Sequence, residues 1–149
     1  MIKIKNFYSG IILLFIVVSA CSQGFEKLPE SQIDQSRIEL AKNFSDNYFT
    51  ALKNDQYYEF HDEAIEALSK NLTPEKQKQA YQSIKDLFGD YQSLEYVEAW
   101  KSSGAQGMTI IRLKGSFDED KAKPEIRVVL NEENKIAGFW IKPWADELR

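Results

Sequence analysis

The spacing of apolar residues changes at Gly89, and this change constrains the fold more than any other feature of the sequence. Before Gly89, apolar side chains recur every three or four residues, which is the spacing of one helical face. After Gly89 they alternate with polar residues or form short β-branched runs between turns, which is typical of strands. Because short turns join antiparallel neighbours, the sequence predicts an α+β domain in which helices come first, a four-stranded antiparallel sheet follows, and the helices lie on one face.

Three helical segments are expected before Gly89. The first occupies residues 31–53, and the second occupies residues 57–68 across one or two short helices. Thr73-Pro74-Glu75 marks the start of the third, because it combines an N-capping threonine, a proline whose missing N–H is harmless there, and an acid near the positive end of the helix dipole. Gly89 ends this helix. The four strands are expected at residues 94–100, 108–113, 125–130 and 135–141.

An apolar run precedes the single cysteine of the chain. Lys3 and Lys5 come first, and the apolar run after them is shorter than the roughly 20 residues needed to cross a bilayer. Val18-Ser19-Ala20-Cys21 resembles the lipobox of bacterial lipoproteins, in which a peptidase cuts before the cysteine and the sulfur is lipidated. The alternative is an ordinary signal peptide that happens to precede a cysteine. We therefore expect a signal peptide, a lipidated cysteine with its tether, and a single α+β domain, at residues 1–20, 21–32 and 33–149.

The resemblance to lipoproteins also implies a location and a partner. It implies several acyl chains, palmitate among them, on Cys21. Two or more chains hold a protein firmly on a bilayer, where one chain does not. We expect a lipid-anchored protein of the bacterial cell envelope, outside the cytoplasm, at the periplasmic face or the cell surface.

The net charge and the absence of certain motifs limit the classes of partner and ligand that are expected. The formal net charge of −4 becomes −6 when the signal peptide with its two lysines is removed. Such a balance argues against nucleic acid as a partner, and it offers no electrostatic help at an anionic membrane surface. The sequence has one cysteine and one histidine, and it lacks a glycine-rich phosphate loop and a calcium-loop motif. Neither a metal site nor a cofactor is expected.

The closing strands and the order of elements resemble a known bacterial family. Residues 127–143, from Arg127-Val128-Val129-Leu130 to Ile141-Lys142-Pro143, are similar to the last hairpin of the family named domain of unknown function 3887. The stretch Phe44 to Leu72, the following Thr73-Pro74-Glu75, and Gly89-Asp90-Tyr91 fit the same pattern, so the resemblance covers about Ile38 to Pro143. It implies a nuclear-transport-factor-2-like, cystatin-like cone, with helices in the concave face of a curved four-stranded antiparallel sheet. No activity is established for the family, so it supplies no catalytic residues.

Two ionisable residues are candidates for acid–base chemistry. His61 is the only histidine and lies in an apolar helical stripe, and histidine titrates near neutral pH. Its structural alternative is a boundary residue hydrogen-bonded to the backbone or to Asp62. Glu98 shares a predicted strand face with aromatic side chains, which would raise the pKa of its carboxyl and suit it to act as a base. Its alternative is an ion pair across the sheet with Arg112 or Arg127.

Aromatic residues form a second set of candidates. They could line a pocket for an apolar or ring-shaped ligand. Their regular helix and strand spacing is also that of an ordinary core. The set comprises Tyr48, Phe60, Tyr81, Trp100 and Trp140, with Trp144 as a further member.

These features favour a non-catalytic, lipid-anchored domain that binds a small ligand or a protein of the cell envelope. One alternative is a cone-fold enzyme of the isomerase or dehydratase type that acts on a small apolar molecule. Another is an accessory subunit that docks the face of its sheet on a larger envelope protein. A closed cavity with an acid and a base would distinguish an enzyme from a binding domain.

The lipobox-like motif generates the first prediction. Cys21→Ser removes the sulfur that carries the acyl chains, so the domain should leave the membrane fraction. Fractionation and intact mass of the native and Cys21→Ser proteins measure this, with Ser22→Ala as the control. A Cys21→Ser protein that stays in the membrane pellet at its processed mass would contradict the lipoprotein interpretation.

Overall fold

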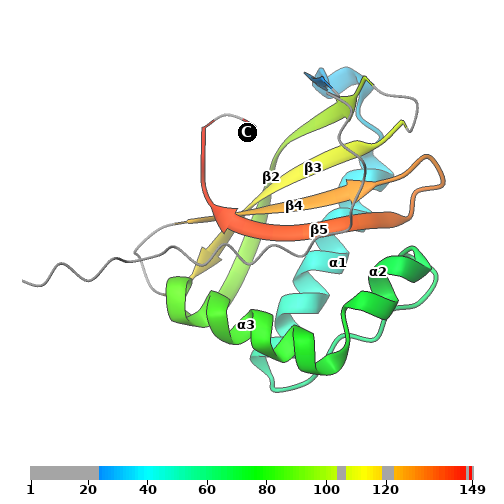
Figure 1. Cartoon of the computed structure of the whole chain (residues 1–149). Coiled ribbons are helices and arrows are strands. Elements are labelled where there is room, and N and C mark those ends of the chain that lie inside the picture. The colour runs from blue at the N-terminus through cyan, green and yellow to red at the C-terminus, as the bar shows by residue number, and fades with distance from the viewer. Residues whose placement is uncertain (1–23, 104–106, 119–122, 147, 149) are drawn as a thin grey trace, which may run out of the picture.

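The computed structural model describes residues 24–103, 107–118, 123–146 and 148 (Figure 1). The predicted signal peptide and the predicted lipidation site Cys21 lie outside the described residues. Within them, no helix is both long enough and apolar enough to cross a membrane.

The described chain is an α+β domain, as the change of period at Gly89 predicts. One short strand precedes the helices, and the four strands after them form an antiparallel meander, so that the spatial order of the sheet is β1-β2-β3-β4-β5. A short 3-10 turn lies at Glu30–Gln32. The helices are α1 (Gln35–Lys53), α2 (Glu66–Asn71) and α3 (Pro74–Phe88), and the strands are β1 (Phe25–Lys27), β2 (Tyr91–Ser102), β3 (Thr109–Phe117), β4 (Pro124–Leu130) and β5 (Ile136–Pro143).

The described sheet has five strands, so the predicted number of four was wrong. The additional strand β1 lies within the segment expected to be a tether, and it pairs with the end of β2 through Phe25↔Ser102 and Lys27↔Trp100. The sequence did not indicate this strand because it is only three residues long and each of its residues is exposed, so it has no apolar alternation. The sheet is not closed, since β1 and β5 form its two edges.

Helix starts and ends follow local chemistry. The side chain of Asp34 caps α1 by accepting from the Ser36 backbone N–H at 2.9 Å. Thr73 caps α3 in the same way, with Lys76 N–H at 3.5 Å from its hydroxyl, as Thr73-Pro74-Glu75 predicted. Gly89 ends α3 with φ of 86°, a conformation that favours glycine.

The second predicted helix was largely wrong. Only residues 66–71 are helical there, and the residues before them are turn and extended chain. The backbone of that segment hydrogen-bonds to the first residue of β5. The Ile136 N–H donates to the carbonyl oxygen of Glu63 at 2.7 Å, and the Ile65 N–H donates to the carbonyl oxygen of Ile136 at 3.0 Å. Its apolar residues pack on the core from an irregular segment, so their helical spacing was coincidental.

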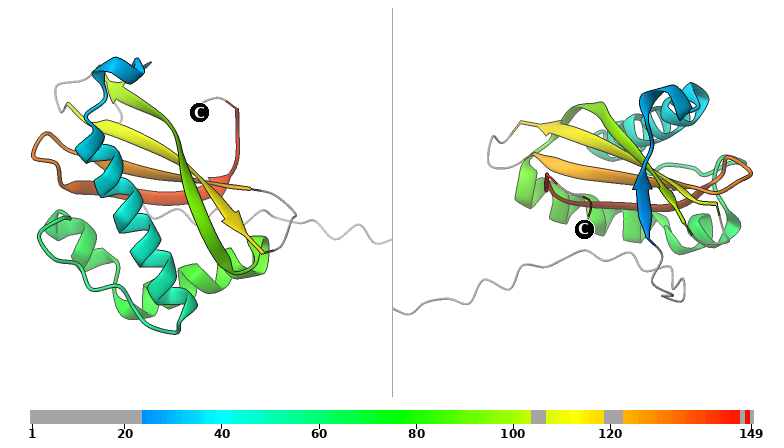
Figure 2. Two further views of the ribbon diagram at one scale, coloured as in Figure 1. Left: turned by 180° about the vertical axis from the view of Figure 1, so that it is seen from behind. Right: turned by 90° about the horizontal axis from the view of Figure 1, so that it is seen from above.

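The helices cover one face of the sheet (Figures 1 and 2). In the rear view of Figure 2, α1 crosses in front of the strands, whereas in Figure 1 it lies behind them. Between the helices and the sheet is a core of interlocking aromatic rings. Phe44 lies at its centre, with its ring centroid 4.9 Å from that of Phe139 and 5.4 Å from that of Tyr58.

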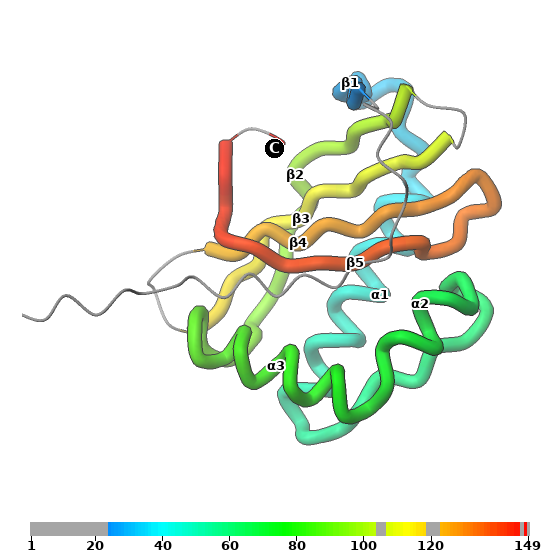
Figure 3. The backbone as a smooth tube through the Cα atoms, viewed as in Figure 1, coloured from blue at the N-terminus to red at the C-terminus, as the bar shows by residue number. Residues whose placement is uncertain are grey.

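Strand register assigns side chains to two faces, since directly paired residues point the same way. Leu113 and Ile126 are paired and belong to the core, so they lie on the helix-covered inner face. Their neighbours Arg112 and Arg127 are also paired and point to the other side, which we call the outer face. Figure 3 traces the strands that carry them. The outer face comprises Phe25, Lys27, Ser93, Glu95, Glu98, Trp100, Ser102, Ile110, Arg112, Lys114, Ser116, Glu125, Arg127, Val129, Gly138, Trp140 and Lys142.

Candidate functional site on the outer face of the sheet

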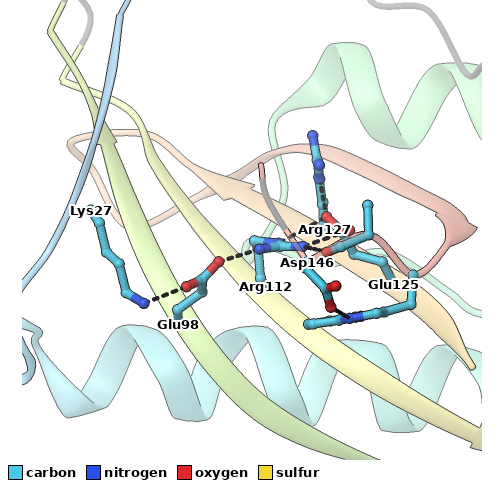
Figure 4. Close-up of polar contacts among 8 residues, drawn as sticks. Lys27, Glu98, Arg112, Glu125, Arg127 and Asp146 are labelled. Carbon is cyan, nitrogen blue, oxygen red and sulfur yellow. Dashed lines mark hydrogen bonds and ion pairs between the residues drawn. The ribbon is translucent and has the colours of Figure 1, made fainter. Parts of the chain in front are cut away.

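Charges of alternating sign form a row across the outer face (Figure 4). The row contains Lys27 on β1, Glu98 on β2, Arg112 on β3, and both Glu125 and Arg127 on β4. Lys27 Nζ is 2.6 Å from Glu98 Oε2, and Glu98 also pairs with Arg112. Glu125 binds Arg112 on one side and Arg127 on the other. We call these five residues the ion cluster.

Arg112 is the centre of the ion cluster, and its side chain is completely buried. Its Nε and Nη2 atoms donate to the two oxygens of Glu125 at 2.9 and 2.8 Å, the bidentate geometry that suits guanidinium and carboxylate. Its Nη1 donates to Glu98. A buried cation is tolerated when such partners offset its desolvation cost of several kcal/mol, as here.

The chain after β5 folds back over the ion cluster. Arg112 Nη2 donates to the carbonyl oxygen of Ala145 at 2.6 Å, and the Arg112 guanidinium carbon is 4.8 Å from the centre of the Trp144 ring. Lys114 Nζ lies 4.9 Å from the same ring centre. Two hydrogen bonds hold Trp144 in place. Its backbone N–H donates to the carbonyl oxygen of Lys123 at 3.0 Å, and its indole N–H donates to Asp146 Oδ1 at 3.2 Å. We call residues 144–146 the tail, and the tail therefore covers one end of the outer face.

Both carboxylates of the ion cluster are held in the charged form. Burial by itself would raise the pKa of Glu98, but the hydrogen bonds from Lys27 and Arg112 outweigh it, and the pKa lies below the ordinary value. The same opposition holds for Glu125, where Arg112 and Arg127 lower the pKa against the effect of burial. The expectation of a raised pKa at Glu98 was wrong, because aromatic neighbours were weighed there without these cations.

Glu98 and His61, the two residues proposed from the sequence for acid–base chemistry, have different surroundings in the structure. Glu98 pairs with Arg112, one of the two arginines expected for it. His61 is exposed, in the chain before α2, and its backbone N–H donates to Glu63 at 3.1 Å. Glu98 is on the outer face and His61 is in a segment that packs on the helical side, so the structure does not bring the two candidates together.

The predicted aromatic set is divided between the two faces of the sheet. Tyr48 and Phe60 both contact the Phe44 ring in the inner core. The Tyr81 hydroxyl is 3.1 Å from Asp90 Oδ1, and burial raises the pKa of Tyr81 to about 12. Trp100 and Trp140 lie on the outer face, where both are partly exposed. The five residues do not line one common space.

Glu125, Lys27 and the role of Arg112 as a centre were not identified from the sequence. One signal in the sequence could have indicated them. Arg112, Glu125 and Arg127 interrupt runs of β-branched and apolar residues, and Glu125 and Arg127, two positions apart on one strand, point to the same face. Such residues ordinarily face solvent, and their burial here follows from the cover of tryptophans and tail. Within the described ranges, no group of three or more His, Cys, Asp and Glu side chains is arranged to hold a metal ion.

Comparisons with known proteins identify one family. A model described as "Protein of unknown function (DUF3887)" matches residues 45–139. The match runs from within α1 to within β5, and it spans most of the inner core and all of the ion cluster except Lys27. No curated protein and no solved structure matches the chain significantly.

Removing the central cation should destabilise the domain strongly. Arg112→Met leaves Glu98 and Glu125 buried without their main partner, so the free energy of unfolding should fall by about 3–5 kcal/mol in chemical denaturation. Lys70→Met is the matched control, because it removes an exposed i,i+4 ion pair with Glu66 and should cost less than about 1 kcal/mol. Equal losses in the two variants would contradict the role assigned to Arg112.

The lowered carboxyl pKa values also predict the pH dependence of stability. In acid the folded protein binds fewer protons at Glu98 and Glu125 than the unfolded chain does. Their stabilisation is therefore complete above the ordinary pKa of 4.5 and is lost as the pH falls through the lower folded values. Glu125→Gln should flatten this loss, whereas Glu66→Gln at an exposed site should not. Unfolding free energies between about pH 7 and pH 3 measure both slopes, and an unchanged slope in Glu125→Gln would contradict the assignment.

Proposed function

The chain belongs to the DUF3887 family of proteins of unknown function, and from this premise we propose that it is a non-catalytic, lipid-anchored domain of the bacterial cell envelope. Its binding surface is the outer face of the sheet. The observation that carries this proposal is that the ion cluster fixes charges in place on this face, where Trp144 lies over Arg112 and where Trp100 and Trp140 are partly exposed.

The ion cluster suits recognition better than proton transfer. A general acid or base works best when its pKa lies near the working pH. The pKa values of Glu98 and Glu125 are both shifted down, away from neutrality, and arginine stays protonated throughout. The cluster therefore serves as a fixed charged framework of the outer face, from which the Lys27 side chain reaches solvent.

The packing of the inner face also supports binding through the outer face. Its centre is filled by ring-to-ring contacts, among them Tyr48 with Phe139 at 5.0 Å and Phe49 with Tyr91 at 5.0 Å between ring centroids. These rings stabilise the fold by packing on one another. Binding through the outer face leaves this core undisturbed.

Lipid anchoring rests on the sequence. The motif Val18-Ser19-Ala20-Cys21 follows an apolar run that is too short to span a bilayer. Acylation also accounts for a single cysteine in a compartment that oxidises free thiols. The domain then lies outside the cytoplasm and is held there by the acyl chains.

We further assign the domain to the nuclear-transport-factor-2-like cone folds. Helices that precede an antiparallel meander and cover one of its faces support this assignment. So do the irregularities of register in β2, at Tyr91/Ser93 and Tyr96/Glu98, because bulges bend a strand. The outer face is then the side away from the interior of the cone.

Photo-cross-linking in intact cells tests which face binds. A photoreactive phenylalanine analogue at Trp140 should give an adduct with an envelope component, detected by intact mass of the purified protein. The same analogue at Leu87, an exposed apolar residue of α3, is the matched control and should give none. Adduct formation at Leu87 without any at Trp140 would overturn the proposed binding surface.

A further inference from the structure

We propose that the outer face of the sheet docks on the anionic lipid bilayer that holds the Cys21 anchor. This inference rests on the proposed lipid anchoring and adds the occupant of the outer face. It follows from the position of β1, the distribution of aromatic residues and the distribution of charge.

The strand β1 brings the domain close to its anchor. Only residues 22–24 separate Cys21 from Phe25, so four peptide steps of at most about 3.5 Å each limit the distance to roughly 14 Å. The sheet holds this segment by the pairing of β1 with β2 and by the Ser103 backbone N–H, which donates to Gly24 at 2.9 Å. A domain held so closely lies against the membrane surface.

The same strand indicates which face meets the membrane. Lys27 points to the outer face, where it reaches Glu98. Phe25 is two residues earlier on the strand and therefore points the same way. Phe25 is 45% exposed, one of the few large apolar residues with such exposure. The chain thus leaves the domain toward the anchor beside an exposed aromatic ring of the outer face.

All three tryptophans of the chain belong to this surface. Trp100 and Trp140 are on the outer face by register, and Trp144 lies over Arg112 from the tail. Each is partly exposed. Tryptophan favours the boundary between lipid and water, where its apolar ring and its polar N–H are both accommodated.

Charge is distributed unevenly despite the acidic net balance. The outer face carries five cations and three carboxylates. Glu98 and Glu125 are buried in ion pairs, whereas Glu95 is exposed opposite Lys114, and the tail adds the exposed Asp146. From Asp34 to Asp90, which covers the helices, eleven acidic residues outnumber seven basic ones. The cations of the outer face are Lys27, Arg112, Lys114, Arg127 and Lys142.

Lys142 lies near other cations of the outer face. Its pKa is lowered first by burial and then by the nearby charge of Arg127, while Glu125 opposes this shift. An anionic surface opposite these groups would offset their repulsion. Screening at physiological ionic strength confines the effect to roughly 8 Å, so it requires the close approach that β1 imposes.

Tryptophan fluorescence reports on this one surface, because all of the tryptophans lie there. The lipidated protein is reconstituted in vesicles of phosphatidylcholine with or without phosphatidylglycerol, prepared with brominated acyl chains as quenchers. We expect quenching in the phosphatidylglycerol vesicles, less quenching in phosphatidylcholine alone, and relief of quenching by salt.

Charge variants make the test specific. Lys114→Gln/Lys142→Gln should lower the docking equilibrium constant roughly 25-fold, about fivefold for each cation removed near an anionic surface. Lys76→Gln/Lys78→Gln removes the same charge from exposed positions on α3 and should leave quenching unchanged. Thermal unfolding of each variant separates loss of docking from loss of fold.

The outcomes separate docking from anchoring. Quenching in anionic vesicles that falls in Lys114→Gln/Lys142→Gln and not in the α3 control supports the proposal. A protein that is lipidated and floats with the vesicles but is not quenched overturns the docking while lipid anchoring stands. Shielding of the tryptophans from aqueous acrylamide that grows with protein density, without lipid quenching, assigns the face to a second copy instead. A protein without acyl chains overturns the proposed function and the docking together.

Discussion

The buried guanidinium of Arg112 is the interaction on which the organisation of the outer face depends. A buried cation without partners would cost several kcal/mol, and Arg112 obtains its partners from β2, β4 and the chain after β5. A slip of one residue in register would turn Glu98 or Glu125 toward the inner core. Arg112 therefore specifies the alignment of three strands and the position of the tail at once.

This constraint explains why the sheet has two unlike faces that are both covered. The inner face is covered by helices and filled by aromatic rings, which is the ordinary apolar solution. The outer face is covered by its own tryptophans and by the tail, and the groups beneath them are charged. Charges in such a layer must be paired, and Glu98 and Glu125 are ionised for that reason. The chemistry of the outer face thus consists of fixed charge and exposed ring surface.

The sequence predicted the elements with strong local signals and missed those without them. The start of α3 and its end at Gly89 have specific capping chemistry, and both were confirmed. The strand β1 has no apolar pattern, because its pairing with β2 is a backbone interaction. For the candidate site, the sequence indicated that Glu98 faces an arginine across the sheet, but the bidentate contact of Arg112 with Glu125 depends on β3–β4 register, which is a tertiary property.

Net charge averages over surfaces that face different directions, so it does not describe the charge of any one face. A chain of formal charge −4 places much of its acidity on the helical side and most of the exposed charge of its outer face on lysines. At a Debye length of roughly 8 Å, a bilayer responds to the face that it contacts and hardly to charges beyond the sheet. In the proposed docking, β1 holds the outer face within about 14 Å of the lipidated cysteine, so the local charge would set the orientation. The acidic helical side would then point away from an anionic bilayer, which removes the repulsion that the net charge suggests.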